Sequence, residues 1–205
     1  MTLFGTAGNC EDFYEKGNKS TLQAPAYLQQ MGLNAFEYSC GRGVMLRENT
    51  ARAIGEAAAA HGVTISIHAP YFTNLCNPDP EKQRATVGYL LKAAQAVIWM
   101  GGRRVVFHPG ALMKMPRQEA RERAENAMRR AVEEVLSAFP DAILCPETLG
   151  KRNQYGTLKE VLSLCAPYGE HVLPCIDFGH LGAAGEASLK SEADFDALLK
   201  EAVEA

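Results

Sequence analysis

The segment VVFHPG, residues 105–110, ends a short apolar run on a histidine and then turns at Pro-Gly. A similar arrangement occurs earlier in SIHAPY, residues 66–71, and later in LCPETLGK, residues 144–151. Short apolar runs that end at Pro or Gly are typical of buried strands. Successive predicted strands therefore end in a residue that can bind a metal or take part in acid–base chemistry.

Helical patterns separate these strands. In residues 117–139 the apolar side chains recur at the spacing of one buried helix face, and oppositely charged pairs four residues apart occupy the other face. Five further helices are predicted at 21–31, 47–60, 81–100, 158–166 and 193–205, and strands at 3–7, 35–40, 64–68, 104–108, 142–148 and 172–180. Strands that alternate with helices predict a parallel sheet with right-handed crossovers.

Two architectures fit this alternation, an open doubly wound sheet and a (β/α) barrel. The first strand is followed by GTAGN at residues 5–9, which is neither the dinucleotide-binding pattern nor a phosphate loop. A barrel would bring the strand ends together on one face, whereas an open sheet would spread them in a line. We therefore predict an α/β fold, a TIM-type (β/α) barrel with about six of its eight strand–helix units, in a single domain spanning residues 1–205.

The residues at the strand ends suit a metal site. The candidates are His68, His108, Glu147, Asp177 and His180. The first four are separated by 40, 39 and 30 residues, each about the length of one strand–helix unit. Imidazoles and carboxylates suit Zn²⁺ and can also hold Mn²⁺ or Fe²⁺. Any one of these residues can equally cap a helix or turn, as Asp177 would for a following helix, but the recurrence at four strands favours a shared site.

Composition and charge narrow the class of protein. The 205 residues are 47% hydrophobic and 22% charged, with a net charge of −3, which is typical of a globular domain rather than a disordered chain or a strongly basic nucleic-acid coat. Six cysteines without a C-x-x-C pair indicate reduced thiols, and no secretory signal or membrane-length apolar run is visible. We expect a cytoplasmic protein that is not inserted in a membrane.

In order along the chain, SIHAPYFTNL, VVFHPG, the PETLGK segment with the NQ-x-GTL that follows it, and CIDFGH resemble the endonuclease IV family of xylose-isomerase-like barrels. The resemblance implies up to three zinc ions and cleavage of DNA 5′ to abasic sites. It assigns His68, His108 and Glu147 to one zinc, Glu147 and Asp177 to a second, and His180 to a third. Glu147, shared by two ions, is the expected catalytic residue. The implied chemistry is attack of a zinc-activated water on phosphorus.

The resemblance also suggests contacts to DNA. Tyr71 matches an aromatic position near the extruded abasic nucleotide, whose loss of pairing lowers the cost of extrusion. Candidate phosphate contacts lie in loops that follow strands, namely Arg42, Lys114, Lys151 and Arg152. They can equally be ordinary surface charges.

Two alternatives stay open at this point. Glu37, in AFEYSC of the second strand, is compatible with a sugar isomerase or epimerase of the same superfamily, which would use Mn²⁺ or Mg²⁺. A barrel domain without turnover could instead serve as a metal-binding or interaction module.

The sequence departs from the family pattern at both ends. Thr6-Ala7-Gly8 replaces a histidine that the family often carries in its first strand. The seventh and eighth units, with their additional ligands, do not follow the sixth, so only one of the three implied zinc sites keeps all its ligands and an inactive fragment is an open alternative. We expect these residues to belong to a chain of roughly 250 residues or more, the usual size of such a barrel.

Overall fold

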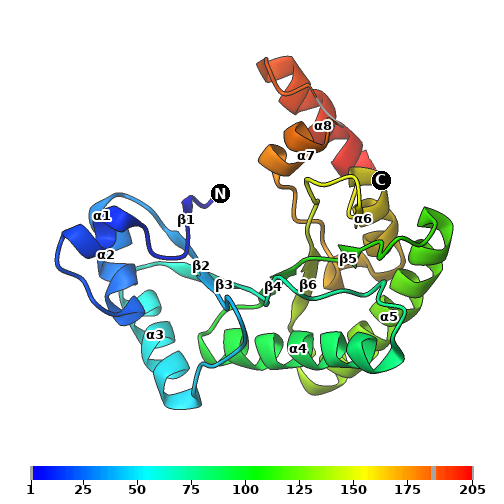
Figure 1. Ribbon diagram of the computed structural model, residues 1–205. Helices are drawn as coiled ribbons and strands as arrows, with labels where there is room; N and C mark the ends of the chain where they lie inside the picture. Colours follow the sequence, from blue (N-terminus) through cyan, green and yellow to red (C-terminus); the bar gives the residue numbers. More distant parts are fainter. Residues whose placement is uncertain (1, 186–187, 205) are drawn as a thin grey trace.

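A parallel five-stranded sheet forms the centre of the protein in the computed structural model, which describes residues 2–185 and 188–204 (Figure 1). The strands lie in the order β1-β2-β3-β4-β6. They are β1 (Gly5–Ala7), β2 (Ala35–Ser39), β3 (Thr64–His68), β4 (Arg104–Phe107) and β6 (Ile143–Pro146). Neighbours in space are also successive in the chain, apart from the short β5, so the wall is built of consecutive strand–helix units as predicted.

The helices follow the predicted alternation. They are α1 (Glu11–Glu15), α2 (Ala24–Gln30), α3 (Glu48–Ala60), α4 (Pro80–Trp99), α5 (Arg117–Ala138), α6 (Leu158–Cys165), α7 (Phe178–Ala184) and α8 (Glu192–Glu204), with 3-10 turns η1 (Thr21–Gln23) and η2 (Ala166–His171). In Figure 1, α3, α4 and α5 cover one face of the sheet. The short α1 was not predicted, whereas α7 is the helix that Asp177 caps in the alternative reading; residue 205 of the last predicted helix lies outside the described residues.

The two faces of the sheet differ in chemistry. Side chains alternate along a strand, so residues in register share a face. One face is apolar and packs into the main core with the helices; it carries Phe36, Ile65, Ile67, Val105, Phe107 and Leu144. The other face carries Glu37 opposite Ser66, and Ser66 opposite Arg104. This second face also holds a small apolar cluster of Val106, Ile143 and Cys145; it is the face that turns inward in a barrel, and it ends at the candidate metal ligands.

The predicted strand over residues 172–180 is wrong as a continuous strand. The chain runs parallel to β6 through two isolated bridges, Leu144 with Val172 and Glu147 with Cys175. The amides of Leu173 and Cys175 still donate to the carbonyls of Leu144 and Pro146, but Pro146 itself has no N–H for the rung between them, which interrupts a regular ladder. Residues from Phe178 onward are helical instead, and the Asp177 side chain accepts a hydrogen bond from the His180 amide at the start of α7.

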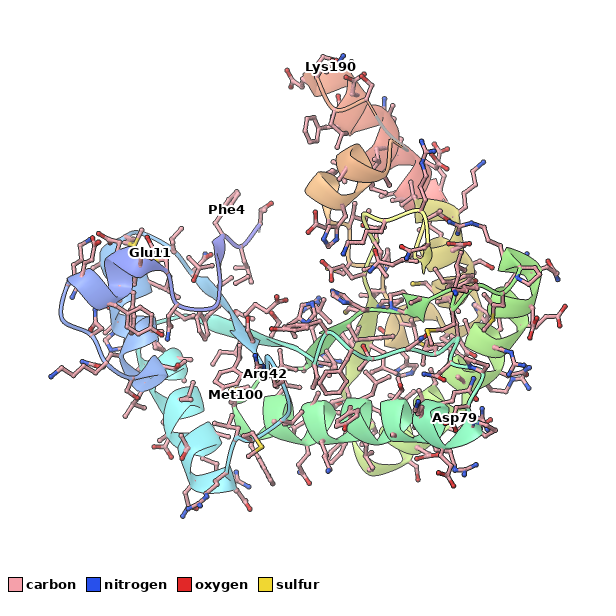
Figure 2. The ribbon with its side chains drawn as sticks, viewed as in Figure 1. Phe4, Glu11, Arg42, Asp79, Met100 and Lys190 are labelled. Atoms are coloured by element: carbon pink, nitrogen blue, oxygen red, sulfur yellow. The ribbon has the colours of Figure 1, made fainter. Side chains whose placement is uncertain are left out.

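Two further features lie at the ends of the five-stranded sheet. A small antiparallel ribbon of β5 (Gly110–Ala111) and β7 (Gln154–Tyr155) joins the loops that follow β4 and β6. At the other end, β1 pairs only with β2 among the described residues, so no ring closure is seen there. Phe4, beside this edge, is 65% exposed (Figure 2). Within the described ranges, no helix is long and apolar enough to cross a membrane.

Candidate metal centre

Three of the predicted ligands converge because their strands are neighbours. His68 is the last residue of β3, His108 directly follows β4, and Glu147 directly follows β6. Parallel strands present their carboxyl ends on one side of a sheet, so these side chains meet. Nε2 of His68 and Nε2 of His108 each lie 3.1 Å from the same carboxylate oxygen, Oε2 of Glu147. The two imidazole rings stand edge to face with centroids 5.1 Å apart.

The hydrogen bonds of the two histidines fix which ring nitrogen faces Glu147. Nδ1 of His68 lies 2.7 Å from the carbonyl of Ala69, and Nδ1 of His108 lies 3.0 Å from the carbonyl of Tyr71. A carbonyl only accepts, so both Nδ1 atoms carry the proton. In the neutral rings Nε2 would then be an acceptor that faces a carboxylate oxygen. This arrangement needs either protonated imidazoles or a metal ion, and backbone carbonyls commonly fix metal-binding histidines in this way.

A second group shares Glu147. Ligand atoms of Glu147, Asp177 and His180 all lie within 4.8 Å of one another, as do those of Glu147, His68 and His108. Nδ1 of His180 lies 3.5 Å from Oδ2 of Asp177 and 3.7 Å from Oε1 of Glu147. The first group is about one-fifth exposed or less, whereas Asp177 and His180 are each more than a third exposed at their side chains. All five predicted metal ligands therefore gather in one cluster around Glu147.

The donor set of each group fits a catalytic zinc site. Two imidazoles with one carboxylate, leaving a position open, is a ligand set known from zinc hydrolases. The second group offers two carboxylates and one imidazole, a harder set that also suits Mn²⁺. Neither group decides which metal is bound.

Charge coupling in the cluster is strong. Burial acts to raise the pKa of Glu147, but hydrogen bonds from His108 and His68 outweigh it and lower the pKa to about 2. Burial acts to lower the pKa of His68, yet the hydrogen bonds to Glu147 and Ala69 raise it overall. Burial also raises the pKa of Glu37, while His68 lowers it and the charge of Glu147 raises it further. Glu37 is therefore electrostatically coupled to the cluster.

We expect the metal-free protein to lose stability as the pH falls from about 4.5 towards 2. The pKa of Glu147 is near 4.5 when unfolded and about 2 when folded, so in this range the unfolded state binds the proton first. The gap between the two pKa values corresponds to about 3 kcal/mol at neutral pH. Urea unfolding in chelator across this range measures it. The Glu147→Gln variant should lack this part of the pH dependence, and an identical profile in both proteins would contradict the expectation.

The predicted substrate-binding residues lie in different settings. Tyr71 is 59% exposed, and its carbonyl holds the His108 ring. Glu37 faces inward on β2. Arg42 lies on the exposed loop that joins β2 to α3 (Figure 2), and Lys151 is exposed after β6. Among the described residues, neither Arg42 nor Lys151 forms an ion pair with the metal-ligand cluster, so their contact with a substrate stays a prediction.

Two buried threonines support the cluster and were not predicted. The Thr73 hydroxyl donates to the His108 carbonyl at 2.9 Å. The Thr148 hydroxyl accepts from the Asp177 amide at 2.8 Å. Each lies within five residues of a predicted ligand, in YFTN and PETL, but spacing alone gives no reason to single out a threonine there.

Comparison with known proteins agrees with this architecture. The profile of the xylose isomerase-like TIM barrel family matches residues 25–203. The chain belongs to this family. Among solved structures of the fold, 3-keto-D-glucoside 4-epimerase from E. coli has a TM-score of 0.72 at 16% identity, covering 98% of this chain and 74% of that one. Endonuclease IV from Thermus thermophilus has a TM-score of 0.63 at 24% identity, covering 90% and 66%. The predicted barrel-type fold is confirmed.

Several sequence relatives are named as probable endonuclease 4. An uncharacterized protein of Methanocaldococcus jannaschii is 30% identical over 203 residues, which are 98% of this chain and 70% of that protein. A probable endonuclease 4 of Acholeplasma laidlawii is 32% identical over 124 residues, which are 59% of this chain and 42% of that protein. The chain thus spans less than half of the second relative. The suspected kinship with endonuclease IV is supported.

Proposed function

We propose that this chain carries the metal centre of a zinc-dependent phosphodiesterase that hydrolyses DNA 5′ to abasic sites. The observation that carries the proposal is the pair of three-ligand groups that share Glu147. Two adjacent metal ions are the arrangement that clamps both the attacking and the leaving oxygen in phosphoryl transfer. The relatives named endonuclease 4 support this reading over others in the family.

The chain's own residues have distinct tasks in this proposal. When bound, zinc supplies a Lewis acid for the phosphate and makes a water a competent nucleophile near neutral pH. His68 and His108 present Nε2 because backbone carbonyls hold their Nδ1 protons. Glu147 joins the two ligand groups and keeps its negative charge at neutral pH because its pKa is about 2. Asp177 and His180 complete the second group.

The surroundings suit an extended anionic substrate. Tyr71 and Phe72 are 59% and 49% exposed on the loop that follows β3, where aromatic rings can stack on nucleotides. Arg42 and Lys151 would neutralise phosphates without reading bases. In the hydrolysis the oxygen of water forms the new bond to phosphorus, the bond to the 3′-oxygen breaks, and that oxygen takes up a proton.

The direct test uses a duplex with one abasic site and a labelled strand. The metal-depleted chain receives zinc, and cleavage is followed on a gel beside an undamaged duplex and the His108→Ala variant. Zinc-dependent cleavage only 5′ to the abasic site, lost in the variant, is the expected result. No cleavage by a chain that holds two zinc ions would overturn the proposal.

A second candidate function rests on Glu37. Its carboxylate is partly buried on the inward face, feels the charges of His68 and Glu147, and belongs to neither metal group. A carboxylate with a raised pKa near a metal centre suits proton transfer at a sugar carbon. Structures of sugar epimerases share the fold, among them a D-psicose 3-epimerase with a TM-score of 0.69.

The Glu37→Gln variant separates the two candidates. If the site hydrolyses DNA, we expect cleavage of the abasic duplex to change less than about 10-fold, because Glu37 is outside both groups. Loss of a general base would instead lower the rate by about 100-fold or more. Turnover is measured on the abasic duplex with zinc and on D-psicose with manganese. Epimerisation that depends on Glu37, without DNA cleavage, would select the sugar reading.

A further inference from the structure

Thr148 connects the strand that carries Glu147 to the segment that carries Asp177. Its side chain is fully buried, at 0% exposure. The hydroxyl accepts a hydrogen bond from the Asp177 amide at 2.8 Å, and it lies 3.3 Å from the Asp177 carbonyl, to which it donates. A single hydroxyl thus satisfies both backbone groups of a candidate metal ligand.

The backbone of Thr148 holds the other ligand of the same group. Its carbonyl accepts a hydrogen bond from Nδ1 of His180 at 2.8 Å. This contact places the proton on Nδ1, the ring nitrogen that lies 3.5 Å from Oδ2 of Asp177, holds the ring orientation, and leaves Nε2 without a proton. His180 in turn donates its amide to Oδ1 of Asp177 at 2.7 Å. Thr148, Asp177 and His180 therefore form one hydrogen-bonded unit.

This unit is needed because the backbone hydrogen bonds between β6 and the segment 172–175 end before they reach Asp177. Regular pairing beside β6 stops at the hydrogen bond from the Thr148 amide to the Cys175 carbonyl, 3.0 Å. Beyond it the chain leaves the sheet and enters α7. The Thr148 hydroxyl supplies the next rung in place of a backbone group, at the position where Asp177 must stay beside Glu147.

We propose that Thr148 is the positioning residue of the second ligand group, acting through Asp177 and His180 and not on the first group. The inference rests on the proposed metal centre. Thr73 is its counterpart for the first group, since the Thr73 hydroxyl donates to the His108 carbonyl and makes no hydrogen bond to Asp177 or His180.

The test compares Thr148→Val, which keeps the shape and removes the hydroxyl, with Thr148→Ser, which keeps the hydroxyl. Thr73→Val is the matched control at the other group. Each metal-depleted protein is titrated with zinc against a competing chelator. We expect Thr148→Val to weaken the second zinc by about 10- to 100-fold and leave the first within about 3-fold. Thr148→Ser should restore the second zinc, and Thr73→Val should weaken the first instead.

A metal-free measurement separates this inference from the proposed function. In Thr148→Val, amide exchange at Asp177 should accelerate about 10-fold, while the Cys175 amide, bonded to the Pro146 carbonyl at 2.9 Å, stays protected. If the wild type binds no zinc, the proposed function fails and this measurement still decides the role of Thr148. If Thr148→Val does not fold, Thr148→Ala replaces it. Unchanged Asp177 exchange, or equal weakening of both zinc ions, would overturn the inference.

Discussion

Replacement of Glu147 by glutamine is expected to remove metal from both ligand groups at once. Glu147 is the only residue common to the two groups, and both His68 and His108 aim Nε2 at its Oε2 atom. Glutamine keeps the shape but loses the charge and offers one oxygen instead of two. Metal affinity should fall by more than about 100-fold, beyond the range seen when only a supporting hydrogen bond is lost. Elemental analysis after gel filtration measures the metal content.

The matched controls are Glu134→Gln and Asp177→Asn. Glu134 is exposed on α5, so its variant should keep the wild-type metal content. Asp177 belongs only to the second group, so its variant should lose one metal and keep the other. Full metal content in Glu147→Gln would show that the two groups do not share a ligand and would remove the basis of the proposed function.

The strands and long helices could be predicted because their signals are local. The predicted strand 64–68 coincides with β3, and the predicted helix 117–139 exceeds α5 by one residue. Alternating burial along β3 and a continuous apolar stripe on α5 reflect packing against one side, which the sequence must encode residue by residue. The histidines at the strand ends then lie close together, because β3, β4 and β6 are neighbours in the sheet.

The region after β6 could not be predicted in the same way. Residues 172–180 are apolar enough for a strand, but Pro146 of β6 lacks the N–H for one rung of the ladder and Asp177 caps α7. The sequence does contain both the proline and the helix-capping aspartate, but a prediction based on hydrophobicity alone overlooks them. The short α1 depends on the burial of Phe13. This is a tertiary contact, and the sequence of a five-residue segment does not predict it.

The metal-binding residue types of the site could be predicted from the sequence, but the hydrogen bonds that orient these residues could not. Spacing identifies which residues meet, as for His68, His108 and Glu147. It does not say which ring nitrogen faces the metal, because the carbonyls of Ala69 and Tyr71 decide that. Nor does it identify Thr148, since a hydroxyl that replaces one rung of a ladder has no sequence period.

Replacement of Gly110 by alanine is expected to destabilise the protein strongly and to weaken the first metal group. Gly110 has φ of +146°, a conformation essentially confined to glycine, and a Cβ atom there would lie 2.0 Å from Oδ1 of Asn74. Asn74 accepts from the Cys76 amide and donates to the Ala111 carbonyl, so moving it breaks the contact between the two loops beside His108. Backbone strain and lost hydrogen bonds together should cost about 2–6 kcal/mol.

A double-mutant cycle identifies the cause. Asn74→Ala removes the atom that Cβ would strike, so the pair of substitutions should cost less than the two single effects together, with a coupling of about 1 kcal/mol or more. Gly88→Ala is the control: Gly88 lies inside α4 with nothing within 4 Å of its Cβ position, and alanine there should stabilise by about 0.5–1 kcal/mol. Urea unfolding of the metal-free variants gives all the free energies. If the two unfolding free-energy changes are strictly additive, the cost comes from the backbone conformation of Gly110 alone. The zinc affinity of Gly110→Ala then measures how much the position of His108 depends on that backbone.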